Sequence, residues 1–126
     1  MRPATSEWLE KAEGDYVTAQ REYRARKTPN FDAAAFHAQQ CAEKHLKAYL
    51  QELDIPFPKT HDLVRLLELV PTAPGLASLR QGMAVLSSCA TEYRYPGESA
   101  TREVAREAIS LAQAMRTEIR RLLGVD

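Results

Sequence analysis

The stretch FHAQQCAEKHLKAYL, residues 36–50, decides how the rest of the chain is interpreted. It predicts a helix, because it contains three alanines and neither glycine nor proline. It also carries two histidines, two glutamines, two lysines, one glutamate and one cysteine, which is more polar chemistry than a packing helix needs. Either these groups form a functional site, or they are the solvated side of a helical bundle.

On a helix running from about residue 32 to residue 53, the apolar and polar residues separate onto opposite sides. The apolar stripe is rich in alanine and consists of Phe31, Ala35, Ala38, Ala42, Leu46, Tyr49 and Leu53. The polar side holds His37, Gln40, Lys44, Lys47 and Gln51. Phe36 projects toward this polar side, where an aromatic ring has no packing reason to lie. We therefore expect this side to meet a second protomer or a ligand, unless a neighbouring loop covers the ring.

The other helices can be assigned because glycine and proline fall almost entirely between the periodic segments. Helices are predicted over about 6–26, 32–53, 61–70 and 76–92, and from Ser99 or Thr101 to Leu123. No segment shows the period of two that is typical of a strand. The predicted fold class is therefore all-α, an antiparallel up-and-down helical bundle of four long helices plus one short helix. Residues 1–126 form a single domain.

Composition limits the classes of function that need to be considered. Lys+Arg and Asp+Glu balance at 17 each, so no net field attracts the chain to nucleic acid or to a membrane. No apolar run approaches the ~20 residues of a membrane span, and the N-terminus lacks the apolar core of a signal peptide. Cys41 and Cys89 lie in helical surroundings without a CxxC spacing. This pattern predicts reduced thiols in a cytoplasmic protein.

His37, Cys41 and His45 are spaced i, i+4, i+8 along one side of the helix, with His61 as a conceivable fourth ligand. Neighbouring members of this set could chelate a divalent ion, but the outer two are too far apart to share one. Boundary histidines beside a buried thiol are the favoured interpretation, so we expect no metal and no other cofactor. The sequence also lacks a Walker loop, GxGxxG and GxSxG.

Three blocks in order, FHAQQCAEKHLKAYL, KTHDL and EYRYPG, resemble the HEPN family of small helical bundles. Together with intervening helices of matching length, the resemblance spans nearly the whole chain. It implies a homodimer and an operon partnership with a minimal nucleotidyltransferase. It also implies either nucleotide binding or RNA cleavage.

The sequence departs from the family at the motif for RNA cleavage. RNase members of the family carry an arginine followed, after four to six residues, by a histidine near the last helix. None of the three histidines, His37, His45 and His61, has an arginine at that distance before it. We therefore expect RNA cleavage to be absent or weak, which leaves enzymatic activity uncertain and favours a binding role.

The resemblance also gives candidate nucleotide-binding residues: Gln40, Lys44 and Lys47 in the helix block, and Arg94 and Tyr95 in the Arg-Tyr-Pro block. The lysines and the arginine could bind phosphate, while the tyrosine could stack on a base. Structural alternatives are a Glu43–Lys47 helix pair, His61 and Asp62 as a cap of the short helix, and a plain turn at RYPG.

The leading functional hypothesis is a nucleotide-binding or partner-binding module that acts with a minimal nucleotidyltransferase in a toxin–antitoxin-type pair. The resemblance implies that this partner could modify Tyr93 or Tyr95. The first alternative is a metal-independent endoribonuclease that uses His61 and Arg94. The second is an interaction bundle without a ligand.

Overall fold

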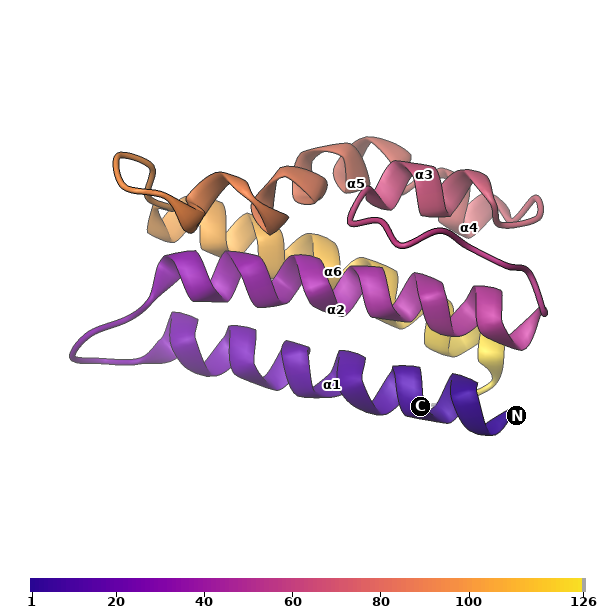
Figure 1. The fold of residues 1–126 in the computed structure, drawn as a ribbon. Helices are drawn as coiled ribbons and strands as arrows, with labels where there is room; N and C mark the ends of the chain where they lie inside the picture. The colour runs from indigo at the N-terminus through magenta and orange to yellow at the C-terminus, as the bar shows by residue number, and fades with distance from the viewer. Residues whose placement is uncertain (126) are drawn as a thin grey trace.

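The computed structural model describes residues 1–125, which contain helices and no strands (Figure 1). Three helices of 22 residues each dominate it: α1 (Pro3–Arg24), α2 (Phe31–Glu52) and α6 (Arg102–Leu123). The segment between α2 and α6 in the sequence forms several shorter helices, which cover one side of the bundle. The predicted all-α, antiparallel fold class is confirmed.

The ends of the long helices follow local chemistry. The side chain of Asn30 accepts a hydrogen bond from the backbone N–H of Ala33 at 2.9 Å and so caps α2. Thr101 caps α6 in the same way, and Gly124 ends it with a left-handed φ of 72°. Helix α1 begins at Pro3, earlier than the sequence predicted, because proline is already set for the first helical position.

The short helix α3 (Leu63–Glu68) begins two residues later than predicted. The Asp62 carboxylate caps it by accepting from the backbone N–H groups of Val64 and Arg65, at 3.0 and 3.2 Å. Asp62 is therefore a helix cap, as expected if the His-Asp-Leu block only starts the short helix.

The fourth long helix, predicted over 76–92, is not continuous. It is divided into α4 (Pro74–Ala77), α5 (Arg80–Ser87) and two 3₁₀ turns, Ser88–Ala90 and Glu92–Arg94. Serine hydroxyls offer the backbone other hydrogen bonds at the end of α5: Ser88 Oγ donates to the carbonyl of Val85, and Ser87 Oγ accepts from the N–H of Leu63. The chain continues directly after α5 as a 3₁₀ turn, which is common at helix C-termini.

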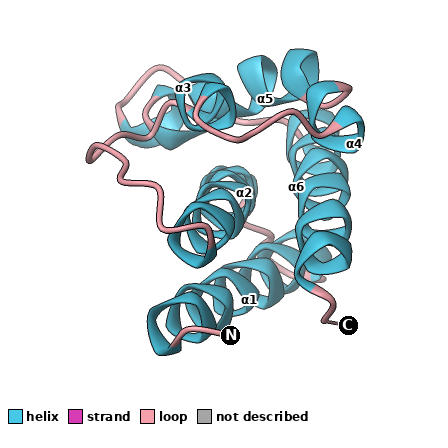
Figure 2. Ribbon diagram, turned by 90° about the vertical axis from the view of Figure 1, so that its right-hand side faces the viewer, coloured by secondary structure: helices cyan, strands magenta, loops and turns pink. Residues whose placement is uncertain are grey.

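Helix α2 lies at the centre of the bundle, with α1, α6 and the α3–α5 layer around it (Figure 2). The middle of its alanine-rich stripe is buried as predicted, with Ala35, Ala38, Ala42 and Leu46 fully inaccessible. Phe31 and Tyr49 are half-buried, and Leu53, at the end of the stripe, is 39% exposed because it lies just beyond the C-terminal end of α2. The polar side of α2 is largely buried as well, because the α3–α5 layer and α1 cover what the sequence left open. Among the described residues, no helix is long and apolar enough to cross a membrane.

Candidate functional site

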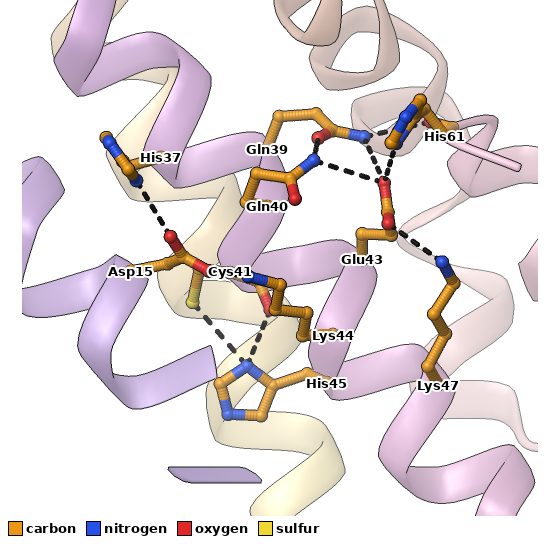
Figure 3. Close-up of polar contacts among 10 residues, drawn as sticks. All are labelled: Asp15, His37, Gln39, Gln40, Cys41, Glu43, Lys44, His45, Lys47 and His61. Carbon is orange, nitrogen blue, oxygen red and sulfur yellow. Dashed lines mark hydrogen bonds and ion pairs between the residues drawn. The ribbon is translucent and has the colours of Figure 1, made fainter. Parts of the chain in front are cut away.

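The polar residues of α2 gather around two buried carboxylates, the first of which belongs to Glu43 (Figure 3). This side chain is 3% exposed. Its Oε1 lies 2.8 Å from His61 Nδ1, and its Oε2 accepts from Lys47 Nζ at 2.9 Å. The amides of Gln39 and Gln40 both donate to Oε1 at 3.3 Å. Four donors therefore surround one carboxylate, as burial of a charge requires.

The second carboxylate belongs to Asp15 of α1 and joins that helix to α2 (Figure 3). Its Oδ1 lies 2.7 Å from His37 Nδ1, and its Oδ2 accepts from Lys44 Nζ at 2.6 Å. The Asp15 side chain is 10% exposed, while its partners His37 and Lys44 are 31% and 24% exposed. The two clusters repeat one arrangement, in which a buried acid binds one lysine of α2 and one histidine.

Three predicted nucleotide-binding residues have partners within the chain. Lys44 and Lys47 are neutralised by carboxylates, and the Gln40 amide donates to Gln39 Oε1 at 2.8 Å and to Glu43. Lys47 also lies over the rings of Trp8 and Phe57, with its ammonium 5.5 and 5.9 Å from their centroids. A phosphate would have to displace a carboxylate partner to reach either lysine.

His61 is the exposed member of the Glu43 cluster, with 62% of its side chain accessible. Its Nδ1 faces the Glu43 carboxylate, which holds the ring in one orientation. A carboxylate that orients an imidazole in this way is the arrangement of many general bases. The predicted partner Arg94 lines a different pocket, which does not include His61.

That pocket lies at the N-terminal end of α2 and has a volume of about 280 Å³. Helix α2 and the residue before it contribute Asn30, Asp32, Ala33, Phe36 and His37, and the 3₁₀ segments contribute Cys89, Tyr93 and Arg94. The structure therefore brings Arg94 to Phe36 rather than to the two lysines. Tyr95 is 69% exposed and does not line the pocket, and neither do Lys44 and Lys47.

The two aromatic residues of this pocket are both half-buried. The Phe36 ring stands edge-on to His37, with centroids 5.3 Å apart and planes at 82°. Burial, followed by the nearby Glu92 carboxylate, raises the pKa of Tyr93, so its phenol stays protonated at neutral pH and can donate a hydrogen bond. The unusual position of Phe36 in the sequence is explained by this pocket, which the 3₁₀ segments cover in part.

The strip of His37, Cys41 and His45 does not converge on one point. His37 turns to Asp15, while His45 Nδ1 donates to the carbonyl of Cys41 at 2.9 Å and lies 3.5 Å from its sulfur. Burial lowers the pKa of His45 to about 4 and raises that of the Cys41 thiol. Within residues 1–125, no three His, Cys, Asp or Glu side chains form a group that could hold a metal. That purified protein lacks stoichiometric zinc stays a prediction for metal analysis.

Two acids have roles that the sequence pattern does not reveal. They are Asp15, which binds groups on α2, and Glu43, which binds more than its helix partner Lys47. A signal existed for Asp15, which lies among apolar residues on the core side of α1 beside Ala12, Tyr16 and Ala19. An acid on an apolar helix face needs a buried cation, and the lysines of α2 are suited to that role.

This all-α bundle, built around a central helix with buried acid–lysine–histidine clusters, is similar to known proteins. A sequence model of the HEPN domain matches residues 5–122, and the chain belongs to the HEPN family. The crystal structure of TT1696 from Thermus thermophilus is 27% identical in sequence, with a TM-score of 0.84. That match covers 95% of this chain and 98% of the other.

The structure of ST0689, an archaeal HEPN homologue, has the same fold. Its TM-score is 0.77 at 24% identity, and the match covers 97% of this chain and 98% of that one. No curated protein matches the chain.

Proposed function

We propose that this HEPN protein binds a nucleotide in the pocket at the N-terminal end of α2, and that it acts with a minimal nucleotidyltransferase. The observation that carries the proposal is the convergence of Phe36, Tyr93 and Arg94 on one pocket of about 280 Å³. Two aromatic rings give a base a surface to stack on. The planar guanidinium of Arg94 is suited to a phosphate.

Arg94 differs from the lysines of α2 because it is exposed and forms no ion pair with any residue in the described range. An incoming phosphate therefore displaces only water from it. Asp32 lines the same pocket, but its Oδ1 already accepts from the N–H of Ala100 at 2.6 Å. The volume is close to the lower limit for small-molecule sites and suits the base and ribose of a mononucleotide, with phosphates outside.

Calorimetric titration with ATP and GTP tests this proposal. Replacing Arg94 with alanine removes a charge-assisted contact and should weaken binding by roughly tenfold to a hundredfold. Arg106→Ala is the matched control, because Arg106 is exposed on α6 and lies outside the pocket. Binding should also weaken with added salt, since exposed phosphate contacts are screened. Equal affinities for wild type and Arg94→Ala would rule out this pocket.

The partnership with a nucleotidyltransferase has its own test. Tyr95 is exposed enough to enter the active site of another protein, whereas the Tyr93 side chain is half-buried and already contributes to the pocket. We therefore favour Tyr95 over Tyr93 as an acceptor of a transferred nucleotidyl group. Co-expression with a neighbouring nucleotidyltransferase gene, followed by intact-mass spectrometry of wild type, Tyr95→Phe and Tyr93→Phe, identifies the acceptor. Absence of an adduct and of co-purification would contradict the partnership.

A second candidate function is metal-independent RNA cleavage, which the Glu43–His61 geometry favours. The oriented imidazole could take the proton of a 2′-hydroxyl, but Arg94 lines another pocket and does not complete that site. We therefore expect incubation of the purified protein with bulk RNA to show little or no cutting. Robust cleavage that disappears in His61→Ala would favour this function over the binding role.

A further inference from the structure

The pocket at the N-terminal end of α2 contains a carboxylate that a phosphate-binding site does not need. Asp32 is half-buried, lines this pocket and forms no ion pair within residues 1–125. A negative charge weakens the binding of an anionic nucleotide unless the carboxylate itself contacts the ligand. Because an ionised carboxylate only accepts hydrogen bonds, it can contact the base or the ribose of a nucleotide, which carry N–H and O–H donors.

The Asp32 carboxylate is fixed at one oxygen and open at the other. Its Oδ1 accepts from the backbone N–H of Ala100 at 2.6 Å, and its place in the first turn of α2 suits the helix dipole. Neither role uses Oδ2, which has no hydrogen-bond partner among the described residues. Within that range, His45 Nε2 is the one buried side-chain nitrogen or oxygen without a partner, so Asp32 Oδ2 is accessible to a ligand.

An amide donor lies two residues before this carboxylate. The side-chain oxygen of Asn30 caps α2 by accepting from the N–H of Ala33 at 2.9 Å, which leaves the two N–H donors of the amide for a ligand. Asn30 is exposed and lines the same pocket. The start of α2 therefore offers the pocket both a donor and an acceptor, and each is oriented by a hydrogen bond to the backbone.

The position of Asp32 on the helix indicates that it contacts the base. Phe36 lies four residues after Asp32, and residues at this spacing are neighbours on one side of a helix. Arg94, which we propose to bind phosphate, comes instead from the 3₁₀ turn Glu92–Arg94. With a base stacked on Phe36 and its phosphate at Arg94, the edge of the base lies toward the start of α2.

We propose that this pocket selects guanine, with the Asp32 carboxylate accepting from N1–H and the 2-amino group of the base while the Asn30 amide donates to O6. The inference rests on the nucleotide-binding function proposed above. Guanine presents two adjacent N–H donors, N1–H and the 2-amino group, and so matches the two oxygens of a carboxylate. Adenine places the lone pair of N1 at this position, which a carboxylate repels.

Calorimetric titration of the full chain with GTP, ITP, ATP and dGTP tests this selection. GTP should bind about tenfold to a hundredfold more tightly than ATP. ITP, whose base lacks the 2-amino group, should bind about tenfold more weakly than GTP. The dGTP affinity should match that of GTP, since the carboxylate contacts the base and not the ribose. These comparisons use the wild-type chain and need no variant.

Asp32→Asn tests the residue itself. Asparagine keeps an oxygen for the Ala100 N–H but replaces one acceptor by a donor, so GTP binding should weaken by about tenfold and the preference over ATP should disappear. Glu92→Gln is the matched control, because it removes an exposed carboxylate beside Tyr93 that does not line the pocket. It should leave the ratio of GTP to ATP affinity unchanged. Circular dichroism checks that both variants are folded.

Three results would each overturn the selection of guanine. They are equal affinities for GTP and ATP, a preference for GTP that survives in Asp32→Asn, and a tenfold loss of affinity with dGTP, which would assign the carboxylate to the ribose. If Arg94→Ala weakens GTP and ATP alike in the first case, the proposed binding function stands and only the selection fails. Absence of binding by all four nucleotides would contradict both.

Discussion

Cations lie both beside the middle of α2 and in the pocket at its N-terminal end, but their environments differ. In the middle, the ammonium groups of Lys44 and Lys47 form ion pairs with the buried carboxylates of Asp15 and Glu43. At the N-terminal end, Arg94 is exposed beside two half-buried aromatic rings and forms no ion pair among the described residues. A cation that already has a buried partner stabilises the fold, whereas an unpaired one beside aromatic rings is available to a ligand.

The largest effect is expected at Glu43. Glu43→Gln leaves the Lys47 ammonium buried without a countercharge, and breaking a buried ion pair costs about 3–5 kcal/mol of unfolding free energy. Urea unfolding followed by circular dichroism measures the loss. The double variant Glu43→Gln/Lys47→Met, which removes the unpaired charge, should recover part of it. A loss below about 1 kcal/mol would show that the cluster is not needed for stability.

A pH-dependent effect is expected at His45, which lies in the same middle region. Its pKa is lowered to about 4 by burial, against about 6.5 when the chain is unfolded. Above pH 6.5 the side chain is neutral in both states, and as the pH falls toward 4 the unfolded chain binds the proton first. Stability should therefore decrease over this range, by about 3 kcal/mol at pH 4.

The control for this pH effect is His45→Gln, which has no titrating group. Its unfolding free energy should be flatter than that of wild type between pH 6.5 and 4, even if it is lower at neutral pH. Parallel curves for the two proteins would show that His45 does not dominate the acid sensitivity.

A moderate effect is expected at Asp15. Asp15→Asn removes the charge that Lys44 and His37 share, but both partners are partly exposed and can be solvated by water. The expected loss is about 1.5–3 kcal/mol, which is smaller than at Glu43. Urea unfolding of the two variants side by side checks the order. A larger loss at Asp15 than at Glu43 would reverse our ranking of the two clusters.

The smallest effect on stability is expected at Arg94. Arg94→Ala should change the unfolding free energy by less than about 0.5 kcal/mol, because the side chain is exposed and has no ion pair within residues 1–125. The same variant should lose nucleotide affinity in calorimetry. A variant that is destabilised by more than about 1 kcal/mol would place Arg94 with the structural residues and remove the contrast between the two regions.

The helices themselves were predictable because their signals are local. The apolar period of α2 gave the buried alanine stripe, and the punctuation by Gly, Pro, Asn and Thr gave the ends of the long helices to within a few residues. The division of 76–92 into α4, α5 and two 3₁₀ turns was not predicted from the sequence. The three sequence blocks were sufficient to identify the family.

For the candidate site, the sequence marked Phe36 as out of place on a polar side and grouped Arg94 with Lys44 and Lys47, whereas the structure places Arg94 beside Phe36 and Tyr93. A helical wheel shows which residues share a side, and it does not show what lies opposite that side. Gln40 and Lys47 lie on the side expected to meet a ligand or a second protomer, yet the Gln40 amide donates to Gln39 and Glu43 and the Lys47 ammonium lies over the rings of Trp8 and Phe57.

By itself, the sequence determined the all-α class, the central alanine-rich helix and membership of the HEPN family. Periodicity and capping depend on residues close together in the chain, and the family motif depends on the order of its blocks. Only the tertiary structure decided which cations are neutralised. Asp15 is 29 residues away from Lys44, and His61 is 18 residues away from Glu43. A charge's partner is set by distance in space, and packing around α2 brings these groups within 3 Å while it leaves Arg94 exposed.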